Sequence, residues 1–221
     1  PFMIREMKKT LPRANCVIVG EPTLLKLVDG HKASIGLDTE VTGFEVHSSL
    51  LPSGVSAIMT ASRLINWITD KTEENQRKTP RDLDKLFNPP FTTLHVGKIS
   101  GGTASNITAK KCSFTTDIRC LPLDDGEKII NDYEKYAEKL IAQMKEIRPE
   151  ANISINRHHW VPGLKPENDG FAESLVRKIT GENSTGKVSY GTEAGQFQEE
   201  GYSTVICCLL YTSDAADDRD S

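Results

Sequence analysis

The sequence predicts a mostly parallel α/β domain interrupted by an inserted ferredoxin-like α+β domain with the element order β-α-β-β-α-β. Three observations lead to this prediction. From residue 33 to residue 160, apolar side chains follow strand and helix periodicities in that order. The apolar run Cys16–Val19 before this unit is typical of a buried strand. A helical pattern at 171–179 and apolar runs near Val188 and Val205 follow the unit, so parts of a second domain flank it.

The first strand and the first helix of the inserted unit are predicted from their apolar spacing. Residues 35–41 alternate between apolar or threonine side chains and small or polar ones, as in a half-buried strand. In residues 56–74, apolar side chains recur at steps of three and four, which places them on one face of a helix. The polar, proline-containing run 71–90 is predicted to be a loop.

Two strands, a helix and a last strand complete the unit. The runs 91–99 and 112–118 are predicted strands, and the glycine-rich turn between them indicates an antiparallel pair. Asp124 or Asp125 can cap a second helix, and the last strand begins near residue 153. We therefore expect two helices on one face of a four-stranded antiparallel sheet.

Composition argues against several classes of partner. The formal net charge is -4 and no block of basic residues occurs, so we expect no nucleic-acid partner and instead a small molecule. No apolar run approaches the roughly 20 residues of a membrane span, so we expect no membrane association. The 5 cysteines are odd in number and form no Cys-x-x-Cys pair, which favours a reducing compartment and a cytoplasmic location.

Both ends of the sequence predict truncation. The chain begins without Met and soon enters a buried-strand signal that needs neighbouring strands. Near the other end, an apolar run passes into an Asp-rich stretch without periodicity, so we expect a non-native tail at 208–221. We accordingly divide the chain into fragments of the larger domain at 1–30 and 161–207, with the inserted domain at 31–160.

Two polar residues stand where predicted strands end. Glu21 directly follows the run Cys16–Val19, at the carboxyl end of what we expect to be a central strand, where open α/β sheets bind ligands. It is also explained as a turn glutamate, with Pro22 ending the strand. His47 precedes Ser48 and Ser49 at another strand end, where simple capping is the alternative.

Five segments together resemble a known family. They are Val19–Thr23, His47–Ser49 with Pro52, Gly54, Ala57 and Ile58, Gly102–Asn106, Asp117–Arg119, and Gly191–Ala194. In this order they resemble the acetylornithine deacetylase / succinyl-diaminopimelate desuccinylase family of zinc metallopeptidases, over about Asn15 to Cys207. The resemblance implies that the larger domain is catalytic, and that the inserted domain is a lid and dimerisation domain.

The resemblance also implies roles for individual residues. Glu21 aligns with a metal ligand, and zinc accepts carboxylate oxygen readily. His47 aligns with the lid histidine that stabilises the oxyanion in the partner subunit's active site, a role for which an imidazole N–H is suited. Asn106 and Arg119 align with residues that hold the substrate's carboxylate or reacting carbonyl. A guanidinium suits a carboxylate, although strand alternation also allows Arg119 to pair with a neighbour on the open sheet face.

The last motif implies substrate contacts at the far end of the chain. Gly191 and Thr192 are expected to offer a backbone or hydroxyl contact, and Glu193 is expected to bind a side-chain amine of the substrate. By the resemblance, the family's His-x-Asp motif, its Glu-Glu pair and its final histidine are expected to lie upstream of Pro1 or downstream of Cys207. The fragment is therefore expected to be inactive alone.

The function implied by the resemblance is hydrolysis of an N-acyl amino acid, in the first place N2-acetyl-L-ornithine, giving ornithine and acetate in arginine biosynthesis. Two zinc ions are expected in the parent protein, with cobalt or manganese as possible substitutes, and a homodimer through the lid domain. Alternatives are a succinyl-diaminopimelate desuccinylase or a general aminoacylase or dipeptidase. From another class, a non-catalytic dimerisation or small-molecule-binding module also remains open.

The other histidines are poor candidates for metal ligands. His158 and His159 are adjacent on a predicted strand and should point to opposite faces. His31 and His95 lack a ligand-spaced partner, so we expect each to be solvated or hydrogen-bonded.

Overall fold

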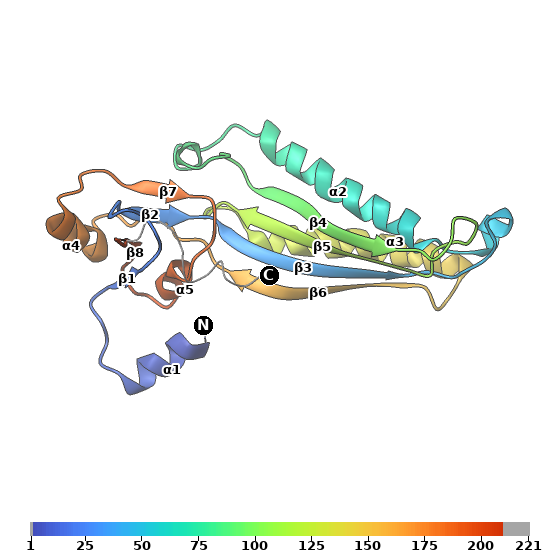
Figure 1. The fold of residues 1–221 in the computed structure, drawn as a ribbon, viewed down its shortest axis with the longest axis horizontal. Helices are drawn as coiled ribbons and strands as arrows, with labels where there is room; N and C mark the ends of the chain where they lie inside the picture. The colour runs from blue at the N-terminus through green and yellow to red at the C-terminus, as the bar shows by residue number, and fades with distance from the viewer. Residues whose placement is uncertain (1, 210–221) are drawn as a thin grey trace.

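The computed structural model describes residues 2–209 and contains two four-stranded sheets (Figure 1). The smaller sheet has the strand order β1-β8-β2-β7, and the larger one β4-β5-β3-β6. The predicted tail lies outside the described residues except for Cys208 and Leu209. Cys208 is tied into the fold, because its backbone N–H donates to Thr23 Oγ1 and its carbonyl accepts from the Leu25 N–H.

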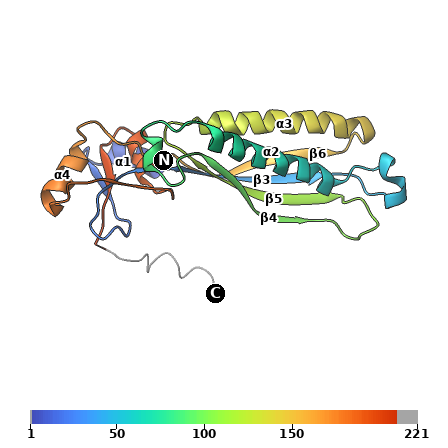
Figure 2. The same ribbon diagram turned by 90° about the horizontal axis from the view of Figure 1, so that it is seen from above.

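The larger sheet confirms the predicted β-α-β-β-α-β order. Its elements are β3 (Ala33–Thr42), α2 (Ala57–Arg77), β4 (Thr93–Gly101), β5 (Lys111–Cys120), α3 (Gly126–Ile147) and β6 (Asn152–Val161). All three strand pairs are antiparallel. Helices α2 and α3 run side by side over one face of the sheet (Figure 2). Two short 3-10 turns, η1 (Ser48–Ser53) and η2 (Asp84–Leu86), lie in the connections.

One apolar core lies between this sheet and its two helices. Alternate residues of β5 are buried, as the period of two in a strand requires. From the helices, Leu64 and Tyr133 are 0% and 2% exposed and belong to the same buried apolar cluster as β3 residues such as Ile35. Each helix begins at a side-chain cap: Ser56 accepts from the Met59 N–H, and Asp125 accepts from the Lys128 N–H.

The smaller sheet contains the flanking segments. Its strands are β1 (Val17–Val19), β2 (Val28–His31), β7 (Gly186–Val188) and β8 (Thr204–Ile206), with helices α1 (Phe2–Thr10), α4 (Phe171–Thr180) and α5 (Ala194–Glu199). Pairs β1–β8 and β2–β7 are parallel, as expected, while β2 meets β8 in antiparallel orientation. Within residues 2–209, β1 pairs only with β8 and lies at an edge of the sheet, so the central position of the strand before Glu21 stays a prediction.

The chain first passes from the smaller sheet to the larger one through a single residue. Strand β2 ends at His31 and β3 begins at Ala33, so Lys32 alone spans the crossover. The chain returns after β6, where Leu164 forms a bridge with His31. Figure 1 shows the smaller sheet at one end of the molecule, with the long strands of the larger sheet extending away from it. Among the described residues, no helix is both long and apolar enough to cross a membrane.

Candidate functional site

Glu21 lies close to the last sequence motif. The residue follows β1 and is half-buried. Burial raises the pKa of its carboxyl group, and the negative charge of Glu193 raises this pKa further. Burial, and then the charge of Glu21, likewise raise the pKa of Tyr190. Glu21 and the segment 190–193 therefore form one group of side chains, which we call the Glu21 group.

The segment that carries Gly191, Thr192 and Glu193 is held closely against the crossover. Thr192 is 4% exposed, and its Oγ1 accepts a hydrogen bond from the Ala194 N–H at 3.1 Å, at the start of α5. Gly191 approaches β3 so closely that a Cβ atom there would lie 3.0 Å from Ser34 Cβ. A side chain at position 191 would push this segment away from the sheet.

His47 and Asn106 lie together in another part of the molecule. His47 precedes η1, and its Nδ1 accepts from the Ser49 N–H, so the capping alternative describes its local contacts. Its backbone forms a bridge with Ile107, and the Ser48 N–H donates to the Asn106 carbonyl at 2.8 Å. Both side chains are exposed. We call them the His47 group.

The two groups are far apart within one chain. Strand β3 begins at the crossover and its 10 residues lead toward the His47 group. At a rise of about 3.4 Å per residue, this strand alone spans roughly 34 Å. The His47 group of one chain therefore cannot meet the Glu21 group of the same chain without a large rearrangement.

Arg119 lies on the open face of the larger sheet. It is half-buried, and its Nε donates to Asp117 Oδ2 at 2.8 Å. This contact is the neighbour pairing that strand alternation allows. Across the sheet, Arg119 is opposite Ser34 on β3 and Thr93 on β4, so it lies near the crossover and not beside His47.

A complete metal cage is not formed by residues 2–209. No cluster of three or more His, Cys, Asp or Glu side chains in this range is arranged to hold an ion. Glu21 and Glu193 offer two neighbouring carboxylates, and a cation between them would relieve their repulsion. Because a zinc site needs at least three protein ligands, the described residues alone do not fit the expected pair of zinc ions.

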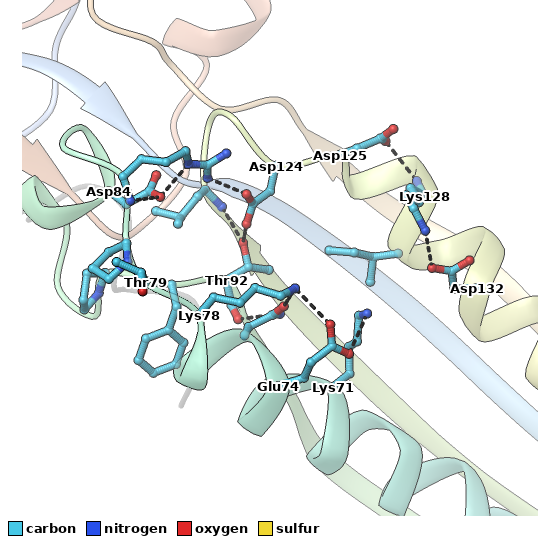
Figure 3. A pocket seen from close by; sticks show the side chains of 17 residues that line it. Lys71, Glu74, Lys78, Thr79, Asp84, Thr92, Asp124, Asp125, Lys128 and Asp132 are labelled. Carbon is cyan, nitrogen blue, oxygen red and sulfur yellow. Dashed lines mark hydrogen bonds and ion pairs between the residues drawn. The ribbon is translucent and has the colours of Figure 1, made fainter.

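A charged cavity of about 460 Å³ lies beside the crossover, away from the predicted site residues (Figure 3). It is bounded by the end of α2, residues 78–92 and the start of α3. Its charges pair with one another: Arg81 binds Asp84 and Asp124 at 2.6 Å and 2.5 Å, and Lys128 binds Asp132. Through Arg81, this pairing joins the 78–92 segment to Asp124 before α3, which indicates a structural network.

The remaining histidines make specific contacts. The ring of His158 lies over Gly36, where a Cβ would be only 2.4 Å from Nε2, and its Nδ1 is 3.1 Å from Asp38 Oδ2. His31 is fully buried and hydrogen-bonded, as one of the two expected outcomes for it requires. His95 is exposed to solvent, which is the other expected outcome. Sequence reasoning did not identify Tyr190 or Lys32. For Lys32 the available signal was the polar pair His31–Lys32 directly before the strand-like run 35–41.

A model of one protein family matches residues 29–145, and its description is peptidase dimerisation domain, M20 type. The chain belongs to this family. The match includes the crossover, the His47 group and Arg119 of the dimerisation domain. It ends within α3 and does not include the Glu21 group.

Curated relatives of this dimerisation-domain chain carry the name acetylornithine deacetylase. The protein from Myxococcus xanthus is 35% identical over 196 residues, which is 89% of this chain and 50% of the relative. The protein from Pasteurella multocida is 31% identical over 188 residues, covering 85% of this chain and 47% of the relative. The chain thus spans about half the length of the curated relatives it matches, and these matches confirm the resemblance.

Solved structures show the same fold. An aminopeptidase PepT from Bacillus cereus superposes with a TM-score of 0.63 at 20% identity, covering 90% of this chain and 51% of the other. A tripeptidase from Staphylococcus aureus gives 0.60 at 20% identity, covering 92% and 51%. Both similarities extend across the dimerisation domain and the flanking segments.

Proposed function

We propose that this chain acts within a metal-dependent amide hydrolase that removes the acyl group from an N-acyl amino acid, with N2-acetyl-L-ornithine as the substrate. The observation that carries this proposal is that 89% of the chain aligns with an acetylornithine deacetylase at 35% identity. It is supported by the position of Glu21 beside the segment 191–193, since a carboxylate of raised pKa next to a second carboxylate favours a cation.

In this proposal the site is completed by a second copy of the chain. The His47 group is too far from the Glu21 group of its own chain, and a homodimer through the lid domain would bring one to the other. Exposed apolar side chains are available for such an interface. On α2, on β4 and in the connection beside His47 they include Ile58, Met59, Ile99 and Ile107, which are 40%, 65%, 55% and 39% exposed.

The chain's own residues would bind substrate and stabilise charge. Arg119 would exchange its contact with Asp117 for the substrate's carboxylate, which a guanidinium binds through two parallel hydrogen bonds. His47 and Asn106 would donate to the oxygen of the reacting carbonyl as negative charge develops on it. Two zinc ions, replaceable by cobalt or manganese, would need ligands besides Glu21 from outside residues 2–209, so we assign no step to a metal here.

Assays on the complete hydrolase test the proposal. Hydrolysis of N2-acetyl-L-ornithine well above that of an N-succinylated diaminopimelate supports the deacetylase, and the reverse supports the desuccinylase. Broad activity on acyl amino acids or dipeptides supports the general aminoacylase or dipeptidase. A protein that binds no metal and hydrolyses none of these substrates would instead be a dimerisation or small-molecule-binding module.

The in-trans role of His47 has its own test. His47→Ala should lower kcat by about 100- to 1000-fold, the usual cost of losing one oxyanion donor, while the dimer and the metal content stay unchanged. His95→Ala is the matched control, because His95 is also an exposed histidine of the same domain. Unchanged turnover in His47→Ala would refute the role.

A further inference from the structure

The buried imidazole of His31 contacts two backbone groups at the crossover. Its side chain is fully buried at the end of β2. Nδ1 lies 2.8 Å from the Lys32 carbonyl oxygen, and Nε2 lies 3.2 Å from the Gly195 nitrogen. A carbonyl can only accept and a backbone N–H can only donate, so Nδ1 carries the proton and Nε2 carries none. The two contacts together define a neutral imidazole in one tautomer.

The Gly195 contact holds the start of α5. Gly195 lies two residues after Glu193 and belongs to the first turn of the helix. A Cβ atom at position 195 would lie 2.1 Å from the Pro162 carbonyl oxygen, so the helix start is pressed against the return from β6. His31 therefore joins the crossover to the segment that follows the Glu21 group.

We propose that His31 is a positioning residue for the segment 191–195, and that it holds this segment only as the neutral imidazole protonated on Nδ1. The importance of the segment for substrate rests on the proposed function. The hydrogen-bond geometry of His31 does not.

Protonation of His31 would break the contact. Nε2 would then carry a hydrogen directed at the Gly195 N–H, and two donors cannot bond to each other. Burial lowers the pKa of His31, whereas its bond to the Lys32 carbonyl and the charge of Glu193 oppose this effect. The Lys32 ammonium is directed away, to the carbonyls of Pro89 and Phe91.

The sign of the pH effect follows from the lowered pKa. The unfolded chain takes up a proton near pH 6.5, whereas the native chain takes it up only at lower pH. The contribution of His31 to stability is therefore complete above pH 6.5. It is lost as the pH falls below that value toward the native pKa.

Nitrogen-15 NMR and amide hydrogen exchange on the 221-residue chain test the proposal. At pH 7.5 we expect the imidazole of His31 to show a protonated Nδ1 and an unprotonated Nε2. Exchange protection of the Gly195 amide, corrected for intrinsic rates, should fall by about tenfold or more as His31 becomes protonated, the cost of losing one buried hydrogen bond. A protonated Nε2 at pH 7.5 would overturn the proposal.

Two substitutions separate positioning from simple packing. His31→Gln places an amide oxygen near the Nε2 position, so it should keep the protection of Gly195 within about threefold and remove its acid dependence. His31→Leu should lower protection by about tenfold at every pH. Acid dependence that persists in His31→Gln would contradict the proposal, and His95→Gln is the control. If His31→Leu fails to fold, the wild-type tautomer and the His31→Gln variant still decide between positioning and simple packing.

None of these measurements uses catalysis. If the complete protein hydrolyses none of the proposed substrates but His31 shows the expected tautomer, the proposed function fails and the positioning role of His31 stands. The wrong tautomer in an active deacetylase would remove the positioning role alone.

Discussion

Lys32 makes the stability of the folded chain depend on pH. It is the only residue between β2 and β3, its side chain is fully buried, and its Nζ donates to the Pro89 and Phe91 carbonyls at 2.7 Å each. Burial lowers its pKa from 10.5 to about 8, although nearby Cys120, Asp124 and Asp84 oppose this effect. Replacing it in Lys32→Met removes the charge and keeps much of the side-chain volume.

The size of this pH effect follows from the difference in proton binding between the native and the unfolded chain. Below pH 8 both the native and the unfolded chain carry the Lys32 proton, so the cost of burying the charge is present in full. Between pH 8 and pH 10.5 only the unfolded chain keeps the proton, so the free energy of unfolding rises with pH. The pKa difference of 10.5 - 8 = 2.5 corresponds to an increase of roughly 3 kcal/mol at most.

Urea unfolding at a series of pH values from 7 to 10.5 measures this increase. The difference in unfolding free energy between wild type and Lys32→Met should rise in favour of wild type across this range. Lys98→Met is the control, because Lys98 is an exposed lysine of β4, and its difference from wild type should stay flat. Parallel curves for wild type and Lys32→Met would refute the reasoning.

Three further predictions concern packing and helix ends. Leu64→Ala in the lid core should lower the free energy of unfolding by about 2–5 kcal/mol in denaturant titration, whereas Leu86→Ala, at an exposed site, should change it by less than about 0.5 kcal/mol. Asp125→Ala removes the cap of α3 and should cost about 1 kcal/mol in the same assay, and no loss would contradict the capping role. Gly195→Ala would place a Cβ against the Pro162 carbonyl and should lower the melting temperature; an unchanged value would show that α5 can shift freely.

The sequence by itself determined the elements of the dimerisation domain and their order. Their signals are local: alternation in β3 and β5, three- and four-residue steps in α2, and a capping aspartate before α3. Helices α1 and α5 and strand β2 were not predicted. Strand β2 has only 4 residues, all of them buried, and its sequence Val-Asp-Gly-His has no alternation that would indicate a strand.

For the candidate site, the sequence identified residues through motifs and resemblance, but it did not place them in space. Only the tertiary structure brought Glu21 next to Glu193 and put the length of β3 between them and His47. For Arg119 it selected the pairing with a neighbour that strand alternation allowed, here with Asp117. Among residues 2–209 it also placed β1 at a sheet edge. The physical reason is that periodicity reports which face of an element is buried, whereas these placements depend on how distant segments pack.

At the crossover, the tertiary structure decided the burial of two polar residues that the sequence did not predict. The sequence contains His31 and Lys32 as two adjacent polar residues, and from it His31 is expected to be solvated or hydrogen-bonded. The structure buries both completely, because the Gly195 N–H and the Pro89 and Phe91 carbonyls, all far away in sequence, satisfy their hydrogen bonds. Burial of a polar side chain depends on partners that only the folded chain brings together.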